Sequence, residues 1–308
     1  MSRSVYLNRF SFCLSQAAQE INESQLIPEK RLPGIGALNP RLRIGLTLVR
    51  ELLHPITNNS MLSSILDTPA QHKGIIWGTV CGAQDAIETN MVTAEQEGVN
   101  EIIPSVYSVG LPNAMAAIVA IHYQFMGHNL SLIGILSGIQ SIILATQKVR
   151  HGNAQMMIAG AYDLPSAKYK EALHSAGVIK NTVSIGQGAS GVLLSTCACF
   201  DASHDGLNSI EILGGDFGYH GDDTLTVAKK IASAAIERIL DSLECHDRTV
   251  KHKITLLHQR DHSNSITYLS SDPLIQISKD LEHSGEKGMV AYTFLDQKQF
   301  STLLVKLV

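Results

Sequence analysis

The chain has 308 residues, of which 44% are hydrophobic and 17% charged, as in a globular protein with a sizeable core. Its formal net charge of −4 provides no polybasic surface for nucleic acid. No run reaches the ~18 uninterrupted apolar residues of a membrane span, and the first ten residues lack the apolar core of a signal peptide. We therefore expect a cytoplasmic protein that binds neither nucleic acid nor a membrane.

The cysteines predict neither a metal site nor a set of disulfides. They are odd in number and lack metal-site spacing: Cys13, Cys81, Cys197, Cys199 and Cys245. Small thiol side chains in a reducing cytoplasm explain them. We expect no metal and no cofactor.

The first part of the chain alternates between strand and helix patterns. Residues 5–13 read as a strand, and Asn39-Pro40 starts a helix, with Asn as the cap and Pro at the first helical position. Residues 74–79 form a buried strand, and the polar run 85–97 is a surface helix or a long loop. Residues 113–126 are apolar nearly all round, which predicts a buried helix.

The central unit of the chain is a strand, a sharp elbow, a helix and a second strand. The first strand is predicted over Asn129–Ile135 and the second over 156–161. Ser137, followed three residues later by Gln140, has the pattern of a capping box. Gly152 follows the last turn of the helix as its C′ residue, after three basic side chains that complement the helix dipole.

The tip of the elbow reads Ile135-Leu136-Ser137-Gly138. In many enzymes such an elbow presents a nucleophile at a helix N-terminus, where the helix dipole stabilises the anionic form. Here an apolar residue occupies the place of the nucleophile.

The alternation continues after the central unit. We predict helices over 166–176 and from Asp222 or Asp223 to about Leu243, and strands over 191–199, 209–213, 254–257 and 303–308. The glycine-rich run 214–221 is predicted as a loop, without a dinucleotide fingerprint or a phosphate-loop lysine. This pattern predicts an α/β protein with a largely parallel sheet.

The central unit resembles the active-site segment of the β-ketoacyl synthases of the thiolase-like superfamily. Their pattern is Gly-Pro-Asn, an apolar strand, Thr-Ala-Cys-x-(Ser/Thr)-Gly, a helix, Gly-x-Ala-Asp, and a strand ending in Ala-Gly-Gly. The matching residues are Gly127, Asn129, Ser137, Gly138, Gly152, Ala154, Ile158, Ala159 and Gly160. The resemblance spans residues 74–196, and the family's catalytic Cys falls at Ile135 or Leu136.

The resemblance implies a five-layered αβαβα fold built from two similar α/β halves, here residues 1–200 and 201–308, with the second half shortened. Active members pair the Cys with two histidines. The first histidine loop matches Leu257–His262, where the glycine and threonine pattern is lost, so that His258 is a relic or an ordinary residue. The second falls near His283-Ser284-Gly285.

Two further kinds of chemistry stay open. Ser137 could replace the cysteine, but a serine nucleophile needs a base and an oxyanion hole, and a capping role explains this residue more simply. His258 and His262 could hold a metal, but Gln259 replaces the glutamate of a His-Glu-x-x-His site.

The function that these residues favour is that of a non-catalytic partner. Ketosynthase-like subunits without the cysteine resemble the chain-length factors of type II polyketide synthases, which pair with an active β-ketoacyl synthase and shape its acyl tunnel. The resemblance implies an acyl carrier protein in the same complex. The alternatives are an acyltransferase, malonyl decarboxylase or hydrolase using Ser137 or His258, and a degenerate acyl-binding homodimer.

Two groups of residues carry the partner hypothesis. The helix 113–126 would line the acyl tunnel through Met115, Ile118, Val119 and His122, although all four could be ordinary core. The resemblance also implies that the strand Asn129, Leu130, Ser131, Leu132 and Ile133 pairs with its counterpart across a dimer axis. The residues suit this role, because an apolar edge without proline or charge needs a cover.

Overall fold

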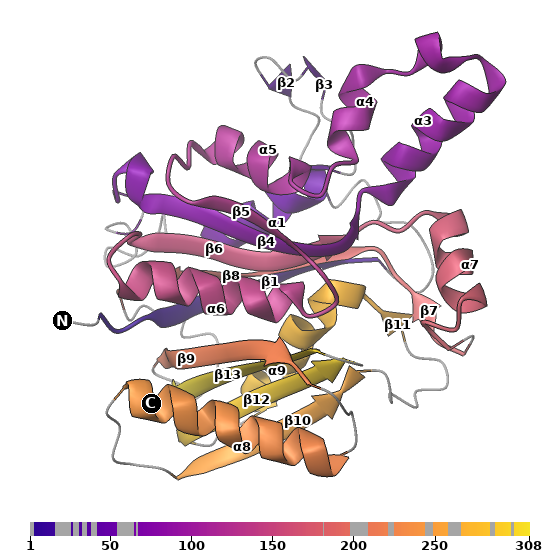
Figure 1. The fold of residues 1–308 in the computed structure, drawn as a ribbon. Helices are drawn as coiled ribbons and strands as arrows, with labels where there is room; N and C mark the ends of the chain where they lie inside the picture. The colour runs from indigo at the N-terminus through magenta and orange to yellow at the C-terminus, as the bar shows by residue number, and fades with distance from the viewer. Residues whose placement is uncertain are drawn as a thin grey trace.

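The structure is a computed structural model. It describes residues 3–15, 26, 31–32, 36–37, 42–53, 65, 67–180, 182–197, 209–220, 225–243, 249–257, 266–283, 287–296 and 299–308. Within these ranges the elements stack in five layers, with helices outside and between the two halves of a sheet (Figure 1).

Nine strands form one continuous ladder in the described part of the chain. Its first half contains, in spatial order, β5 (Asn129–Ile133), β4 (Lys73–Gly82), β6 (Met156–Asp163), β8 (Gly188–Ser195) and β1 (Tyr6–Leu14). Its second half continues with β9 (Ile210–Tyr219), β13 (Gln299–Leu307), β12 (Gly288–Asp296) and β10 (Val250–Leu256). The halves join where β1 pairs with β9.

The two halves repeat one strand order. Strands β9, β10, β12 and β13 of the second half correspond, in chain order, to β1, β4, β6 and β8 of the first. The pairs β4–β6 and β10–β12 are parallel. The pairs β6–β8 and β8–β1 are antiparallel, and so are their counterparts β12–β13 and β13–β9. Among the described residues, β5 has no counterpart in the second half. The fold is therefore two similar α/β halves with a shortened second half. The boundary predicted at residue 200 falls outside the described residues.

The helices fill three layers (Figure 1). The outer layer of the first half contains α1 (Arg43–Leu53) and α5 (Ala114–Tyr123), with α3 (Gln84–Gln96), η5 (Val99–Glu101) and α4 (Pro104–Val109) projecting beyond it. The middle layer contains α6 (Ser137–Arg150) and α9 (Asp272–His283), and α8 (Leu225–Ser242) covers the second half from outside. None of the described helices is both long enough and apolar enough to cross a bilayer.

The remaining elements are short. They are α7 (Ala167–Ser175), η4 (Ala70–His72), η7 (Leu269–Ser271), β2 (Arg31–Leu32), β3 (Gly36–Ala37), β7 (Ser184–Ile185) and β11 (Ile266–Thr267). Of these, η7 lies against the N-terminal turn of α6 and so bears on the site.

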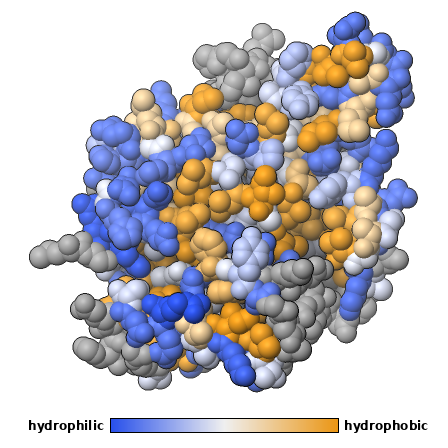
Figure 2. All heavy atoms as spheres, viewed as in Figure 1, coloured by the Kyte–Doolittle hydropathy of each residue, from blue (hydrophilic) through white to orange (hydrophobic). Residues whose placement is uncertain are grey.

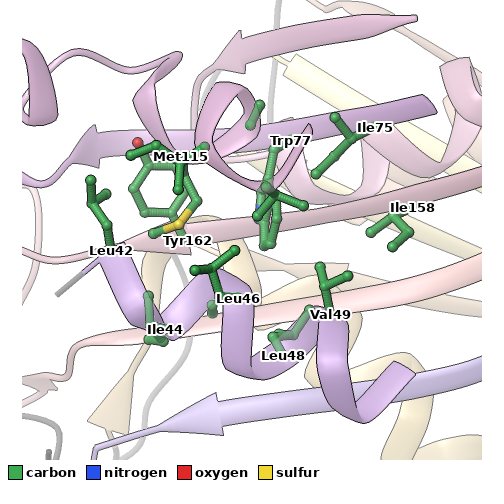
Figure 3. Packing of buried hydrophobic residues seen from close by; sticks show 14 of the residues in the cluster. Leu42, Ile44, Leu46, Leu48, Val49, Ile75, Trp77, Met115, Ile158 and Tyr162 are labelled. Atoms are coloured by element: carbon green, nitrogen blue, oxygen red, sulfur yellow. The ribbon is translucent and has the colours of Figure 1, made fainter. Parts of the chain in front are cut away.

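Two main hydrophobic clusters hold the layers together. In the first, Leu46 and Val49 of α1 face Trp77 of β4 and Met115 of α5 (Figure 3). The second surrounds α6 between the halves of the sheet and includes its fully buried Ile139. Such burial contributes roughly 1.5–3 kcal/mol per large aliphatic side chain. Packing from both sides thus fixes the position of α6.

The structure confirms the predicted strand–helix–strand unit around α6. The helix ends at Arg150, and Gly152 follows with φ of +78°, the left-handed conformation expected of a C′ residue. The polar run 85–97 forms α3, which settles that it is a helix rather than a loop.

Three fold predictions are wrong. The sheet is mixed rather than largely parallel, because β1, β8, β9 and β13 pair antiparallel. The run 214–221 is strand β9 as far as Tyr219, because Gly214 and Gly215 make room for Ile239 and Ile143 from the helices on either side.

The helix α5 is buried on one face only, since Ile121 is exposed.

Candidate functional site

The elbow between β5 and α6 is built by the backbone. Gly134 has φ of +143°, a conformation that favours glycine, and its N–H donates to Thr79 O at 2.9 Å. Leu136 is the N-cap residue of α6, and its carbonyl accepts the first helical hydrogen bond from Gln140 N at 3.0 Å. A strand end, a glycine turn and a helix N-terminus therefore meet at Ile135 and Leu136, where the resemblance predicts the catalytic Cys of the family.

The capping box predicted from Ser137 and Gln140 is wrong. Ser137 is the first residue within α6, and the N-cap residue, Leu136, makes no side-chain capping hydrogen bond. The side chain of Ser137 turns instead toward β4, where its Oγ donates to Thr79 O at 3.5 Å. A Cβ added at Gly78 would lie 2.5 Å from that Oγ, so the side chain of Ser137 fits only because residue 78 has no side chain.

The tip of the elbow is apolar and packed. Leu136 is fully buried in the cluster around α6, and the half-buried Ile135 packs against the same cluster. Ser137 is also fully buried, and its recorded partner is a backbone carbonyl rather than an imidazole that could act as a base. Neither of the two positions expected for the catalytic Cys offers a nucleophile.

A buried carboxylate lies directly behind the elbow, and the sequence reasoning gave it no role. Asp163, the last residue of β6, is fully buried. Its Oδ1 accepts hydrogen bonds from Thr79 Oγ1 at 2.9 Å, Val80 N at 2.7 Å and Cys81 N at 2.9 Å. Its Oδ2 accepts from Ser270 N at 3.0 Å and Ser270 Oγ at 2.5 Å. The carboxylate therefore links the loop after β4 to a turn of the second half.

Electrostatics make this region inert rather than reactive. Burial raises the pKa of Asp163, and the hydrogen bonds from Ser270, Cys81 and Val80 oppose that effect. Burial, and then the neighbouring carboxylate of Asp163, raise the pKa of the Cys81 thiol. Because the thiolate is the nucleophilic form, the raised pKa disfavours Cys81 as a nucleophile.

The second half contributes η7 to the site. A Cβ added at Gly138 of α6 would meet Ser270 O, so only glycine allows this close approach, and Ser271 Oγ donates to Ala161 O at 3.2 Å. Leu269 has φ of +50°, a conformation uncommon outside glycine. The repeated topology makes α9 the counterpart of α6, so η7 is the counterpart of the elbow.

The predicted histidines do not gather at the elbow in the described structure. His258 and His262 lie outside the described residues, as do Ser284 and Gly285. His283 is the last residue of α9, about 16 Å along the helix from the end that follows η7. His283 therefore lies at the end of α9 away from η7, and the mapping of the second catalytic histidine near it stays a prediction. Among the described residues, no three metal-ligating side chains come together.

The proposed tunnel residues lie on α5. Met115, Ile118 and Val119 are buried in the first hydrophobic cluster, where Met115 packs on Gly45 of α1. His122 lies edge-on to Tyr123, with ring centroids 4.7 Å apart. This burial is compatible with a tunnel wall and with ordinary core, so the tunnel stays a prediction. The other face of α5 borders an open hollow of about 620 Å³.

The two ends of the nine-stranded ladder differ in chemistry. The edge strand β10 carries Lys251, His252 and Lys253, and charges of this kind protect a sheet edge from pairing. The opposite edge strand, β5, reads Asn-Leu-Ser-Leu-Ile and has no charge. Leu130 and Ile133 of β5 are exposed, Ile133 to 69%. In Figure 2, hydrophobic side chains gather across the middle of the face that β5 borders.

Comparisons with known proteins agree with this geometry. The family model "Beta-ketoacyl synthase, N-terminal domain" matches residues 35–208, more than half of the chain. This chain belongs to the β-ketoacyl synthase family. Comparison with curated proteins finds no significant match.

Solved structures of the family share the fold. One is described as "AntDE:AntF (apo): type II PKS acyl-carrier protein in complex with its ketosynthase bound to the hexaketide", with a TM-score of 0.71, 15% identity, and 100% of both chains covered. A second is "The ishigamide ketosynthase/chain length factor", with a TM-score of 0.71, 13% identity, and 99% of both chains covered.

A third is "Ketosynthase (ApeO) in Complex with its Chain Length Factor (ApeC) from Xenorhabdus doucetiae", with a TM-score of 0.64, 13% identity, and coverage of 99% of this chain and 98% of that one. The likeness at these identities establishes the thiolase-like fold. The solved structures that share the fold of this chain include complexes of a ketosynthase with a chain-length factor.

Proposed function

We propose that this chain is a non-catalytic ketosynthase-like subunit, a chain-length factor, that pairs with an active β-ketoacyl synthase in type II polyketide biosynthesis. The product class is an aromatic polyketide or an aryl polyene, made in the cytoplasm on an acyl carrier protein. One observation carries the proposal: the N-cap residue of the helix that would present the nucleophile is the buried, apolar Leu136.

The elbow supports loss of catalysis without loss of the fold. A family member needs a thiolate at the start of α6, and Leu136 and Ile135 provide none. The adjacent Ser137 is fully buried and donates to a backbone carbonyl, so it lacks both access and a base. The network around Asp163 nevertheless holds the surrounding turns in place. The elbow would thus keep the fold of an active ketosynthase without the nucleophile and base that catalysis needs.

The edge strand β5 supports a partner subunit. Two large hydrophobic side chains of this strand, Leu130 and Ile133, are exposed, and Figure 2 shows hydrophobic residues gathered across the middle of this face. An exposed apolar surface of this kind marks an interaction site rather than a solvent face. An antiparallel pairing of β5 with the equivalent strand of a synthase would satisfy the open edge and cover the patch. Obligate interfaces of this type bury more than ~2,000 Å².

The role of the subunit in the complex would be to shape the acyl tunnel. The candidates on α5 are Met115, Ile118, Val119 and His122. Because α5 packs on β4 and β5 immediately behind the proposed interface, a change in its side-chain volume would reach the partner's tunnel.

Co-expression with a catalytic β-ketoacyl synthase tests the pairing. We expect a complex containing one copy of each chain, or a dimer of such pairs, in native mass spectrometry. We also expect the chain to aggregate or express poorly when produced alone, because its apolar edge then has no cover. A stable, soluble monomer at micromolar concentration, or a homodimer that ignores the synthase, would contradict the proposal. The homodimer would favour the acyl-binding alternative.

A further inference from the structure

A helical arm extends from the first half of the protein. It consists of α3, η5 and α4, residues 84–109, and it projects at the upper right of Figure 1, away from both halves of the sheet. Its main contacts are internal, between α3 and α4 and between α3 and η5. Apart from these, α4 contacts α5, which in turn packs against β4 and β5.

The arm exposes apolar side chains along its length. Met91 of α3, Val99 at its tip, and Ile103 and Tyr107 of α4 are each more than half exposed. Figure 2 shows hydrophobic residues on the arm, at its upper right. Ile103 is the N-cap residue of α4, and Tyr107 lies within that helix. Leu111, which follows the arm in the chain, is exposed as well.

The charge of this surface has one sign. Between Lys73 and Lys148 the chain contains no lysine or arginine, and its charged residues there are Asp85, Glu88, Glu95, Glu97 and Glu101. The carboxylate of Glu88, at the base of the arm, is 3.5 Å from Lys168 Nζ. The other three glutamates are exposed and cluster at the tip, next to Val99.

Two of these glutamates oppose the stability of the helix that carries them. Glu95 lies in the last turn of α3, and Glu97 is its C-cap residue. The C-terminus of a helix is the negative end of its dipole, where a carboxylate is unfavourable and a lysine is favoured. Glu95 and Glu97 therefore do not stabilise α3. A positively charged surface facing the arm explains their positions better.

We infer that the arm docks on a different chain whose facing surface carries lysine or arginine around an apolar patch, and that its carboxylates disfavour pairing with a second copy. A two-fold interface between identical copies brings the same patch of both chains together, so all the arm carboxylates would repel one another without a cation to offset them. A basic partner gains attraction and faster association from the same charges. This inference rests on the proposed function, because it assumes that the surface beside β5 is an interface.

A charge-reversed variant of this chain can take the place of the inferred basic partner in a binding experiment. The variant Glu95→Lys/Glu97→Lys/Glu101→Lys changes exposed side chains only and should fold. Association of wild type with wild type, wild type with variant, and variant with variant is measured by sedimentation at low and high salt (roughly 50 and 500 mM). We expect the mixed pair to be about tenfold tighter than either like pair at low salt, and the three to converge at high salt.

The control variant is Glu171→Lys/Glu237→Lys/Asp241→Lys, which changes the net charge equally at exposed positions of α7 and α8. Mixed with wild type it should show no such preference. Equal affinities in all three pairings, the same preference with the control, or no association in any combination would overturn the inference.

A second measurement separates the inference from the proposed function. The variant Glu95→Gln/Glu97→Gln/Glu101→Gln is co-expressed with a catalytic β-ketoacyl synthase, and the association rate is measured at low salt. We expect the rate to fall at least several-fold, with the complex still formed. An unchanged rate in a complex that does form would refute the role of the arm and leave the proposed pairing intact. Absence of any complex with the wild-type chain would refute the pairing itself, and the surrogate experiment would still report on the arm.

Discussion

Asp163 Oδ2 accepts two hydrogen bonds from Ser270, one from its backbone N–H at 3.0 Å and one from its hydroxyl at 2.5 Å. The two residues are 107 positions apart in the chain and belong to different halves of the fold. Through Asp163 Oδ1, the same carboxylate holds the loop after β4. One buried side chain therefore links the loop after β4 directly to η7.

Replacing Asp163 with Asn should destabilise the protein. The amide has nearly the same shape, but its NH₂ group would face N–H donors that now meet a carboxylate oxygen. We expect a loss of about 1–3 kcal/mol in the free energy of unfolding, measured by urea denaturation. The control is Asp216→Asn, which removes an exposed pair with Arg238 and should cost about 0–1 kcal/mol. Equal losses at both positions would show that the Asp163 network does not hold the halves together.

Replacing the exposed Ile133 with Lys should block assembly without unfolding the chain. The side chain is 69% exposed, so lysine is tolerated in the isolated subunit, whereas its charge would be buried in a β5 interface. Val178→Lys is the matched control, because Val178 is 54% exposed and lies outside the proposed interface. Pull-down of a co-expressed synthase should fail for the first variant and succeed for the second. Ser131→Pro, which removes a backbone donor from β5, should also prevent pairing.

Replacing Met115 or Ile118 with Ala tests the tunnel. If these side chains limit the acyl chain, the complex should release a longer product, detected by mass spectrometry of the carrier-bound chain. Each variant should also lose roughly 2–5 kcal/mol of stability, because both side chains are buried in the first hydrophobic cluster. Loss of stability with an unchanged product length would identify both residues as core only.

Cys81 should resist alkylation in the folded protein. Its raised pKa keeps it a thiol at neutral pH, and it is buried beside Asp163. A folded pKa above the unfolded value also means that this group's contribution to stability is lost as pH rises above about 9, where the thiol of the unfolded chain ionises. Peptide mapping after iodoacetamide treatment at pH 8 should show Cys81 unmodified until urea is added. Rapid modification without urea would mean an accessible, activated thiol behind the elbow.

Local patterns predicted the central unit well. The apolar strand, the helix with basic residues in its last turn, and the left-handed glycine after it are determined by neighbours in the sequence, and α6 and Gly152 appear as expected. The expectation that the catalytic Cys is lost rests on two apolar residues at the elbow, and it stays a prediction.

The errors arose where distant side chains decide the outcome. Ser137 has a good capping pattern, but its side chain packs over Gly78 of strand β4 and donates a hydrogen bond to Thr79 O instead of capping the helix. Gly214 and Gly215 look like a loop, whereas they are the points where Ile239 and Ile143 press on a strand. The role of Asp163 had no local signal, because its partners lie 83 and 107 residues away.

Release of carbon dioxide from a malonyl-loaded carrier protein tests the central claim most directly. The measurement compares the isolated chain with the same chain bound to a catalytic β-ketoacyl synthase. We predict no release above the uncatalysed rate from the isolated chain, no effect of Ser137→Ala, and turnover only in the complex. Release by the isolated chain that Ser137→Ala abolishes would contradict the account and identify Ser137 as a nucleophile.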